Sequence, residues 1–355
     1  MQQLLPITKE LETVQVLKKL AQTHRALAEL KGLVTSIPNE NILIETLTLR
    51  EAKESSAIEN IISTMDEVYQ GNLLDNQFSS PNTKEVHQYA AALKKGFALV
   101  KKNGLLTNNI ILQIQETLEE NNAGFRKLPG TKLLNDKTGA VIYTPPQEYE
   151  TIINLMQNLE QYINNDEPDR SDPLIKMAVI HHQFESIHPF YDGNGRTGRI
   201  INILYLVQKG LLNLPILYLS NYIIKNKTAY YKLLQEVREK ENWEDWVMYM
   251  LTGVEETATQ SIILITGIKN LMQQYKVSIR THLPKLYSQD LINNLFKYPY
   301  TKIEFIERDL QVSRKTAVRY LEQLQGLGVV KKRKVGRNNF YVNEELYKLL
   351  SLNAF

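Results

Sequence analysis

Residues 188–199 read H-P-F-Y-D-G-N-G-R-T-G-R, which brings a histidine, a carboxylate, glycines and two arginines together within twelve positions. An imidazole can accept a proton near neutral pH. Glycine allows a backbone to approach a ligand closely. Two arginines three residues apart share one face of a helix and can each bind phosphate oxygens. This segment therefore predicts a site that binds a nucleotide.

The segments on either side of this motif must position it. Apolar residues recur at helical spacing from Asp172 to Ile187 and again from Thr197 to Leu212, so the glycines lie in a tight turn between two helices. The N–H groups of Gly193, Asn194 and Gly195 would then open the second helix, and free N–H groups at a helix start bind phosphate. The alternative is a glycine-rich connection to a solvated helix, which explains neither Asn194 nor the order of the polar groups.

The segment resembles the motif of the Fic family, H-x-F-x-(D/E)-G-N-G-R-x-x-R, at every specified position. Fic proteins are mostly nucleotidyltransferases, protein adenylyltransferases that move AMP from ATP to a Ser, Thr or Tyr hydroxyl of a protein. The resemblance implies ATP as the substrate and Mg²⁺ as the metal. Doc-type relatives, which transfer a phosphoryl group instead, carry Lys at the place of Gly195, so the glycine favours AMP transfer.

The resemblance also implies a role for each residue of the motif. His188 would be the base that takes the hydroxyl proton, and Asp192 would be the magnesium ligand. Arg196 and Arg199 would hold the β- and γ-phosphates. The residues that would bind ATP are Gly193, Asn194, Gly195, Arg196, Thr197, Gly198 and Arg199. Such a reaction depends mainly on positioning, a metal and fixed positive charge.

A second motif lies upstream, where residues 51–60 read E-A-K-E-S-S-A-I-E-N and contain S-x-x-x-E-N, beginning at Ser55. It resembles the inhibitory helix that one Fic subgroup carries N-terminal to its core, and we expect this helix over about residues 51–64. Glu59 can pair bidentately with Arg199 and so remove the partner of the ATP γ-phosphate. Ser55, on the same face, can fix the helix near the anion cradle. Ser and Glu four apart also occur on many surface helices.

Two further segments resemble Fic regions. Thr131 to Tyr143 reads as a β-hairpin whose turn lies in Asn135 to Gly139. In Fic proteins a flap hairpin docks the target protein by strand addition; the alternative is a surface hairpin without a function. After the motif, Asn226 and Tyr230 or Tyr231 would line the adenine side of the pocket, and we place Tyr231 among the ATP-binding residues. Aromatic residues at helical spacing are more often core.

The composition limits the class of protein. A chain of 355 residues is long enough for about two domains. It contains no cysteine, which excludes disulfides and thiolate metal sites. The N-terminus lacks a basic start followed by an apolar stretch, and no apolar run approaches about 18 residues. We therefore expect a cytoplasmic protein that does not span a membrane.

The C-terminal part differs from the rest in charge. From Lys285 to Phe355 there are 13 Lys and Arg against seven Asp and Glu, whereas the rest of the chain is mildly acidic. The pattern predicts three helices followed by two strands, which is typical of a winged helix-turn-helix. The predicted elements are helices over Ser288 to Lys297, Ile303 to Leu310 and Arg314 to Leu327, and strands within Val329 to Val342. The basic residues Arg314, Lys315 and Arg319 and the segment Lys331 to Arg337 fit duplex DNA, although winged helices also serve in dimerisation and protein docking.

The expected fold is mainly α. It comprises an N-terminal helical region (residues 1–100), an all-helical Fic core with a β-hairpin flap (101–283) and the winged-helix domain (284–355), with helix breaks at Thr35 to Asn41 and Asn72 to Asn82.

The expected function is an autoinhibited protein adenylyltransferase that acts on a protein substrate, with the protein itself among the candidate substrates. The sequence leaves open whether the same site also removes AMP. A homodimer is expected. The alternative is a nucleotide-sensing, DNA-binding transcription regulator. A zinc hydrolase using His181, Glu185 and His188 would leave the glycine cradle without a function.

Overall fold

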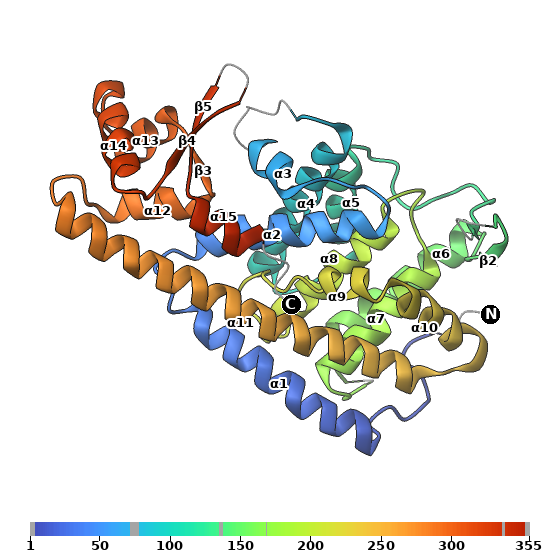
Figure 1. The fold of residues 1–355 in the computed structure, drawn as a ribbon. Helices are drawn as coiled ribbons and strands as arrows, with labels where there is room; N and C mark the ends of the chain where they lie inside the picture. The colour runs from blue at the N-terminus through green and yellow to red at the C-terminus, as the bar shows by residue number, and fades with distance from the viewer. Residues whose placement is uncertain (1–3, 72–77, 135–137, 168, 336–337, 352–355) are drawn as a thin grey trace.

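The computed structural model describes residues 4–71, 78–134, 138–167, 169–335 and 338–351, and most of them are helical (Figure 1). The helices before the motif are α1 (Val14–Val34), α2 (Glu40–Ile58), α3 (Met65–Gly71), α4 (Pro81–Asn103), α5 (Asn108–Glu119), α6 (Tyr149–Asn164) and α7 (Pro173–Ile187). After it come α8 (Asn194–Gln208), α9 (Ser220–Lys225), α10 (Lys227–Lys240) and α11 (Trp243–His282). The expected mainly α fold class is confirmed.

Helices α7 and α8 form the centre of the core. Every residue of α7 from Leu174 to Ile187 is buried, and most of α8 is buried as well. Asp172 caps α7 by accepting a hydrogen bond from the N–H of Leu174, and Pro173 occupies its first turn, where no N–H is needed. These two residues therefore fix the N-terminal end of α7, the helix that leads into the motif.

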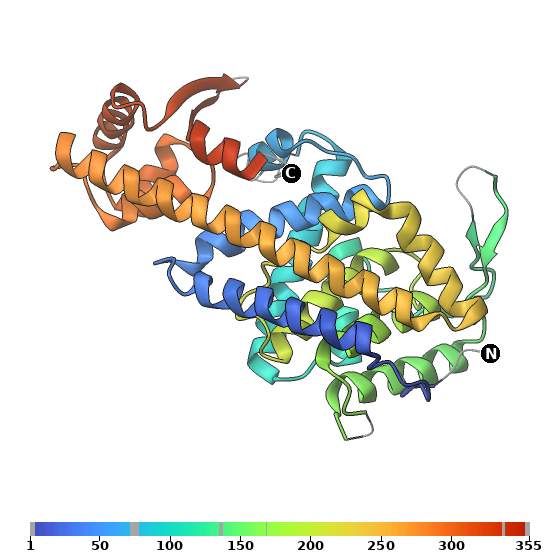
Figure 2. The same cartoon turned by 60° about the horizontal axis from the view of Figure 1, so that its bottom comes forward.

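The two long helices α1 and α11 lie side by side along one flank of the molecule (Figures 1 and 2). Lys19 of α1 forms an ion pair with Glu255 of α11 at 2.6 Å, and Thr23 donates a hydrogen bond to the carbonyl of Leu251 at 3.3 Å.

None of the helices in the described residues is long and apolar enough to cross a membrane.

Both predicted helix breaks fall between helices. The first is the connection between Val34 and Glu40, where Asn39 caps α2. The second separates Gly71 from Pro81, and Ser80 caps α4. Residues 72–77 of this break lie outside the described residues.

The predicted flap hairpin is present as strands β1 (Leu133–Leu134) and β2 (Val141–Tyr143). They pair antiparallel, with Leu133 opposite Tyr143, and a register shift follows Leu133. Residues 135–137 of the predicted turn lie outside the described residues. The side chains of Leu134 and Val141 are 52% and 51% exposed, so the hairpin projects from the core.

The part of the chain from Gln289 to Ser351, which we call the C-terminal unit, follows α11. It contains α12 (Gln289–Lys297), β3 (Tyr300–Thr301), α13 (Ile303–Leu310), α14 (Arg314–Gly326), β4 (Lys331–Val335), β5 (Asn338–Val342) and α15 (Glu344–Ser351). Its sheet is antiparallel in the order β3-β5-β4. The three helices and the hairpin lie where the sequence predicts them, whereas β3 and α15 were not predicted. β3 spans two residues and pairs with a strand some forty residues later, so it leaves no local pattern.

Candidate active site

The motif forms a closed turn between α7 and α8. His188 ends α7 in the left-handed conformation, with φ of 50°, and its N–H donates to the carbonyl of Phe184 at 2.9 Å. The Asn194 side chain bonds both backbone groups of Phe190: its Oδ1 accepts from the N–H at 2.8 Å and its Nδ2 donates to the carbonyl at 2.9 Å. Helix α8 begins at Asn194, within the three residues that were predicted to open it. Asn194 therefore holds the loop in shape through its side chain.

The start of α8 has no side-chain cap and is flanked by carboxylates. Gly193, the N-cap residue, has a φ of 76°, and its N–H donates to Oδ1 of Asp192 at 2.7 Å, so this N–H is not free as predicted. A Cβ on Gly193 would clash with Glu119, and a Cβ on Gly195 would clash with Oε1 of Glu59. The left-handed φ of Gly193 favours glycine there, and at both positions an acidic side chain lies directly against the helix start, where an anion would bind.

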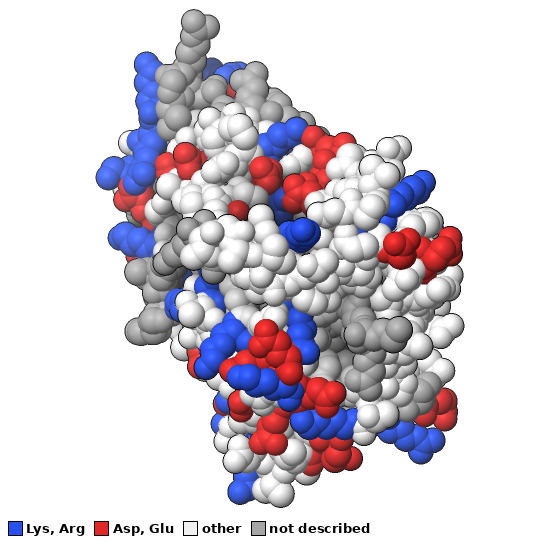
Figure 3. All heavy atoms as spheres, turned by 90° about the vertical axis from the view of Figure 1, so that its right-hand side faces the viewer, with Lys and Arg blue, Asp and Glu red and all other residues white. Residues whose placement is uncertain are grey.

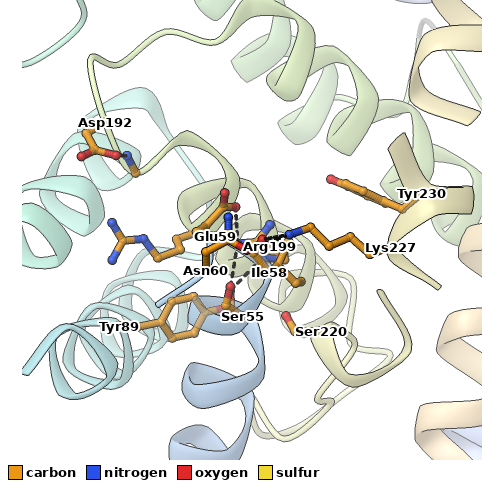
Figure 4. Close-up of polar contacts among 12 residues, drawn as sticks. Ser55, Ile58, Glu59, Asn60, Tyr89, Asp192, Arg199, Ser220, Lys227 and Tyr230 are labelled. Carbon is orange, nitrogen blue, oxygen red and sulfur yellow. Dashed lines mark hydrogen bonds and ion pairs between the residues drawn. The ribbon is translucent and has the colours of Figure 1, made fainter. Parts of the chain in front are cut away.

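Arg199 is held by the end of α2 (Figure 4). Its guanidinium is 2% exposed; Nη2 donates to Oε1 of Glu59 at 2.8 Å and to the carbonyl of Ser55 at 3.0 Å. Nε donates to Oγ of Ser55 at 2.8 Å. Glu59 therefore contributes one oxygen to this pair instead of the predicted bidentate contact, and Ser55 fixes the helix by bonding the arginine directly. Ser55 occupies Nε and shares Nη2, which are the two donors of one edge of the planar guanidinium.

Charge keeps this pair ionised. Burial raises the pKa of Glu59, but the charge and hydrogen bond of Arg199 outweigh it and bring this pKa below its usual value. Burial lowers the pKa of Arg199, and the Glu59 carboxylate more than reverses this effect, so the guanidinium stays charged. The contact is thus a charge-assisted hydrogen bond between a buried arginine and a carboxylate that is 34% exposed.

The helix that carries Ser55 ends earlier than predicted. The expected helix over about residues 51–64 is wrong at its C-terminal end, because α2 ends at Ile58 and Glu59 is its C-cap. Asn60 adopts a φ of 63°, and the N–H of Ile61 donates to the carbonyl of Ser56 at 3.0 Å. Asparagine tolerates this left-handed conformation, which terminates helices. Glu59 therefore extends from a helix end toward the site.

Two residues that the sequence reasoning missed fix α2 in place. Nζ of Lys227, at the start of α10, donates to the carbonyl of Ile58 at 2.6 Å and to Oδ1 of Asn60 at 3.3 Å. A cation at this position neutralises the negative end of the helix. Figure 4 shows Lys227 reaching this end from the side opposite Asp192.

Glu51 is the second residue that the sequence reasoning missed and that fixes α2 in place. Its carboxylate accepts hydrogen bonds from the Tyr89 hydroxyl at 3.0 Å, from the Ser220 N–H at 3.1 Å and from the Ser220 hydroxyl. Burial raises the pKa of Glu51 to about 7 in spite of these bonds. Glu51, Ser55 and Glu59 are four residues apart, so the sequence places them on one helix face. That spacing was the signal that could have identified Glu51.

The candidate base lies in a pocket of about 480 Å³ at the start of α8. The pocket is lined by Glu59, Ile61, Glu85, Leu133, His188, Tyr191, Asp192, Gly193, Asn194, Gly195 and Arg196. Burial and the charges of Arg126 and Arg238 lower the pKa of His188 to about 4. Nε of Arg126 also donates to the His188 carbonyl at 2.8 Å. The imidazole is therefore neutral near pH 7 and can accept a proton.

The first motif arginine also contacts carboxylates. Nη1 of Arg196 donates to Glu85 at 2.7 Å and Nη2 donates to Glu119 at 2.9 Å. Burial raises the pKa of Glu119, as do the charges of Asp192 and Glu85, and these effects outweigh the opposing charge of Arg196. In this structure both motif arginines are paired with carboxylates, so their contact with phosphates stays a prediction.

The other predicted ATP-binding residues are more scattered. Thr197 is fully buried, and a Cβ on Gly198 would press against Glu185, so helix packing accounts for both. Nδ2 of Asn226 donates to the Tyr222 carbonyl at 3.0 Å, at the junction of α9 and α10. Tyr231 is 45% exposed. Contact of these residues with ATP stays a prediction.

The aromatic and histidine cluster behind the motif is core. Tyr230 is buried, and its hydroxyl is 2.8 Å from Nε2 of His181. Burial lowers the pKa of His181 and of His182 to about 3. Within the described ranges no group of three His, Cys, Asp or Glu side chains could hold a metal ion. The zinc-hydrolase alternative therefore has no support from the geometry.

Comparison with known proteins agrees with this geometry. Three family descriptions match successive parts of the chain: "Fic/DOC family N-terminal" at residues 17–98, "Fic/DOC family" at 105–206, and "Protein adenylyltransferase SoFic-like, C-terminal domain" at 271–346. A probable protein adenylyltransferase of Aquifex aeolicus, aq_aa38, is 28% identical over 202 residues, covering 55% of this chain and 57% of the relative. Protein adenylyltransferase Fic of Drosophila melanogaster is 22% identical over 243 residues, covering 66% and 47%. The chain thus spans about half the length of these curated relatives.

Two solved structures have the same fold. A Fic family protein from Desulfovibrio desulfuricans G20 superposes with a TM-score of 0.59 at 18% identity, covering 95% of this chain and 97% of that one. Fic-1 from C. elegans superposes with a TM-score of 0.54 at 17% identity, covering 71% and 73%. Identity at this level shows a common fold alone. Together with the three matched families and the complete motif, it leads to one conclusion: the chain belongs to the Fic/DOC family.

Proposed function

We propose that the protein is an adenylyltransferase that moves AMP from ATP to a Ser, Thr or Tyr hydroxyl of a protein. One observation carries the proposal: His188, Asp192 and the uncapped start of α8 line a single pocket. The hydroxyl oxygen attacks the α-phosphorus and passes its proton to His188. A bond forms between this oxygen and the α-phosphorus while the bond between the α-phosphorus and the oxygen bridging to the β-phosphate breaks. Pyrophosphate is the leaving group.

Magnesium fits the residues of this pocket. The Asp192 side chain is exposed, and one of its oxygens is oriented by the N–H of Gly193. Mg²⁺ binds through one or two carboxylates together with substrate phosphates and water, so Asp192 would be a sufficient protein ligand. When bound, the ion would neutralise phosphate charge. The positive end of α8 would orient the phosphates for attack.

The flap supplies a surface for the protein substrate. Leu133 of β1 lines the pocket, and the neighbouring Leu134, Val141 and Ile142 are exposed. An exposed strand edge can bind an extended peptide through main-chain hydrogen bonds. Uncharged side chains cover much of the middle of the face that carries the flap, and acidic and basic groups are interspersed around it (Figure 3). Such a surface fits a peptide without a strong charge requirement, including a segment of the protein itself.

We infer that the end of α2 inhibits the enzyme. The Glu59 carboxylate lies against Gly195 and bonds Arg199, which otherwise would bind the ATP γ-phosphate. We call residues 55–60 the inhibitory segment. With AMP already attached to a substrate hydroxyl, the same Glu59 carboxylate could orient a water molecule and support the reverse removal of AMP.

The test is incubation of the protein and its Glu59→Gly variant with ATP labelled in the α-phosphate, Mg²⁺ and a cell lysate. Label should enter proteins in a Glu59→Gly reaction and be found on hydroxyl side chains by mass spectrometry. A folded Glu59→Gly protein that transfers no label from the α-phosphate, while a parallel reaction with γ-labelled ATP does label proteins, would contradict an adenylyltransferase.

A basic strand favours DNA contact as a second candidate function. Strand β4 carries the exposed residues Lys332 and Lys334, whereas Arg314 is paired with Glu304 and Glu307. Duplex binding should weaken steeply as salt rises. Binding that is undetectable or independent of salt would favour the docking or dimerisation role, and sedimentation would test the expected homodimer.

A further inference from the structure

We propose that the C-terminal unit is a brace for the inhibitory segment: it contacts the helices on both sides of residues 55–60 and thereby holds Glu59 in the active site. The proposal rests on the inhibitory function of Glu59 proposed above. The surface that the C-terminal unit contacts belongs to the same chain and is formed by α2 and α3.

The first contact is with α2. The Tyr298 hydroxyl, next to α12, donates to Oε2 of Glu45 at 2.5 Å. Glu45 also accepts a hydrogen bond from Lys94 of α4. Burial raises the pKa of Glu45, and the Lys94 charge and these hydrogen bonds outweigh it, so the carboxylate is ionised and accepts strongly. Glu45 lies on α2 and Glu59 is the C-cap residue of this helix, fourteen positions later and roughly 21 Å along its axis.

The second contact is with α3. The Tyr300 hydroxyl of β3 donates to Oδ1 of Asp66. Tyr69, which is fully buried, packs against the rings of Tyr300 and Tyr347 with centroid distances of 6.5 and 6.3 Å, and those two rings lie 6.1 Å from each other. Three aromatic rings from α3, β3 and α15 thus form one interface. Such rings have a large apolar area and specific packing geometry.

The two contacts can act on Glu59 because they lie on either side of the inhibitory segment. α2 ends at Ile58 and α3 begins at Met65, so the unit holds the chain on both sides of the inhibitory segment. In Figures 1 and 2 the C-terminal unit lies beside α2 and α3 and away from the flap. A packed helix transmits displacement along its length, so a shift at Glu45 or Asp66 moves the segment that carries Glu59.

At the active site, contacts hold the C-terminal part of α2, and Glu51, two turns before its end, bonds Tyr89 and Ser220. Arg199 bonds Ser55 and Glu59, and Lys227 bonds Ile58 and Asn60. Weakening the brace should therefore raise the fraction of molecules in which Glu59 has left Arg199, without altering the motif. Any ligand that pulls the C-terminal unit from α2 and α3 would activate the enzyme.

The test uses the full chain with Tyr298→Phe and Tyr300→Phe combined. This variant removes both hydroxyl hydrogen bonds and keeps both rings, so the core stays packed. The matched control is Tyr287→Phe, whose hydroxyl accepts a hydrogen bond from Arg280 of α11 at 2.9 Å. Amide hydrogen exchange of peptides covering residues 55–64 is measured in each protein, and AMP transfer is measured with and without Glu59→Gly.

We expect exchange in residues 55–64 to become at least severalfold faster in the double variant and to stay unchanged in the control. Transfer should rise severalfold in the double variant, whereas the same two tyrosine changes should add nothing to the rate of a protein that already carries Glu59→Gly. Unchanged exchange would overturn the brace. Faster exchange without faster transfer, while Glu59→Gly alone is activating, would overturn its control of activity. If Glu59→Gly itself gives no gain, the inhibitory function fails, and the exchange result alone decides whether the unit holds the segment.

Discussion

The motif loop and the inhibitory segment meet in one site but are held by different kinds of contact. The loop closes on itself, because Asn194 bonds Phe190 four residues away. The segment is held from a distance: Arg199 and Ser55 are 144 residues apart in the chain. A locally closed loop keeps its shape wherever α2 lies, whereas the segment can leave without changing the loop. The site is therefore preformed, and the segment that we propose to be inhibitory can leave it.

The remaining contacts of α2 have the same long-range character. Lys227 and Ile58 are separated by 169 positions, as are Glu51 and Ser220. Each tertiary contact contributes separately, so their losses should differ in size and should leave the motif intact. The following variants test this difference between the two regions.

The largest effect should come from the loop. His188→Ala, introduced beside Glu59→Gly so that transfer is measurable, should lower the transfer rate about 10²–10⁴-fold, because the general base is lost. ATP affinity, measured by calorimetry, should change little. His282→Ala at the exposed end of α11 is the control. Transfer at the parent rate in the His188 variant would remove this residue from the chemistry.

The second-largest effect should be on the free energy of unfolding, and it comes from Glu51, the buried carboxyl group of α2. The pKa of Glu51 is about 7 in the folded protein, above its usual value of 4.5, so the folded state keeps a proton that the unfolded state releases between about pH 4.5 and 7. Relative to Glu51→Gln, the wild-type free energy of unfolding should fall as pH rises through this window, by up to about 3 kcal/mol, and then level off. Urea unfolding at several pH values measures it, with Glu54→Gln as the control. A pH-independent difference would show that Glu51 is ionised throughout.

A smaller effect tests Arg199, the motif arginine that the inhibitory segment contacts. Arg199→Ala beside Glu59→Gly should reverse most of the gain from the single change. A charge-assisted contact with the γ-phosphate contributes about 1.5–3 kcal/mol, which corresponds to roughly 10–100-fold in rate. Steady-state transfer at fixed ATP measures it. An undiminished rate would mean that Glu59 inhibits by occupying space and not by engaging the arginine.

The smallest effect concerns the end of α2. Lys227→Ala removes a cation from a helix C-terminus, a contribution of about 0.3–1 kcal/mol, and should raise transfer about two- to fivefold. Lys232→Ala, further along α10 and 70% exposed, is the control. A fall in transfer specific to Lys227 would instead place this side chain in nucleotide binding.

The sequence predicted what local patterns encode. The helices around the motif, the flap and the three helices of the C-terminal unit follow from apolar spacing and from capping residues such as Asp172 and Ser313, which accepts from the Thr316 N–H. Ser55, Glu59 and Arg199 were brought together only by the family resemblance.

What the sequence did not predict depends on partners far along the chain. Arg196 was expected at a phosphate, and nothing near it indicates that Glu85 and Glu119 converge on its guanidinium. The early end of α2 depends on the left-handed Asn60, and Lys227 reaches it from α10. Such contacts need the packed fold, because the residues involved have no common local pattern.

The most direct test of the central claim is the rate of AMP transfer by Glu59→Gly relative to wild type, with both proteins shown to be folded by circular dichroism. If the Glu59 carboxylate holds Arg199 away from ATP, the variant should transfer AMP to itself or to lysate proteins roughly 10–100-fold faster. A folded Glu59→Gly protein that transfers AMP no faster than wild type would contradict the account.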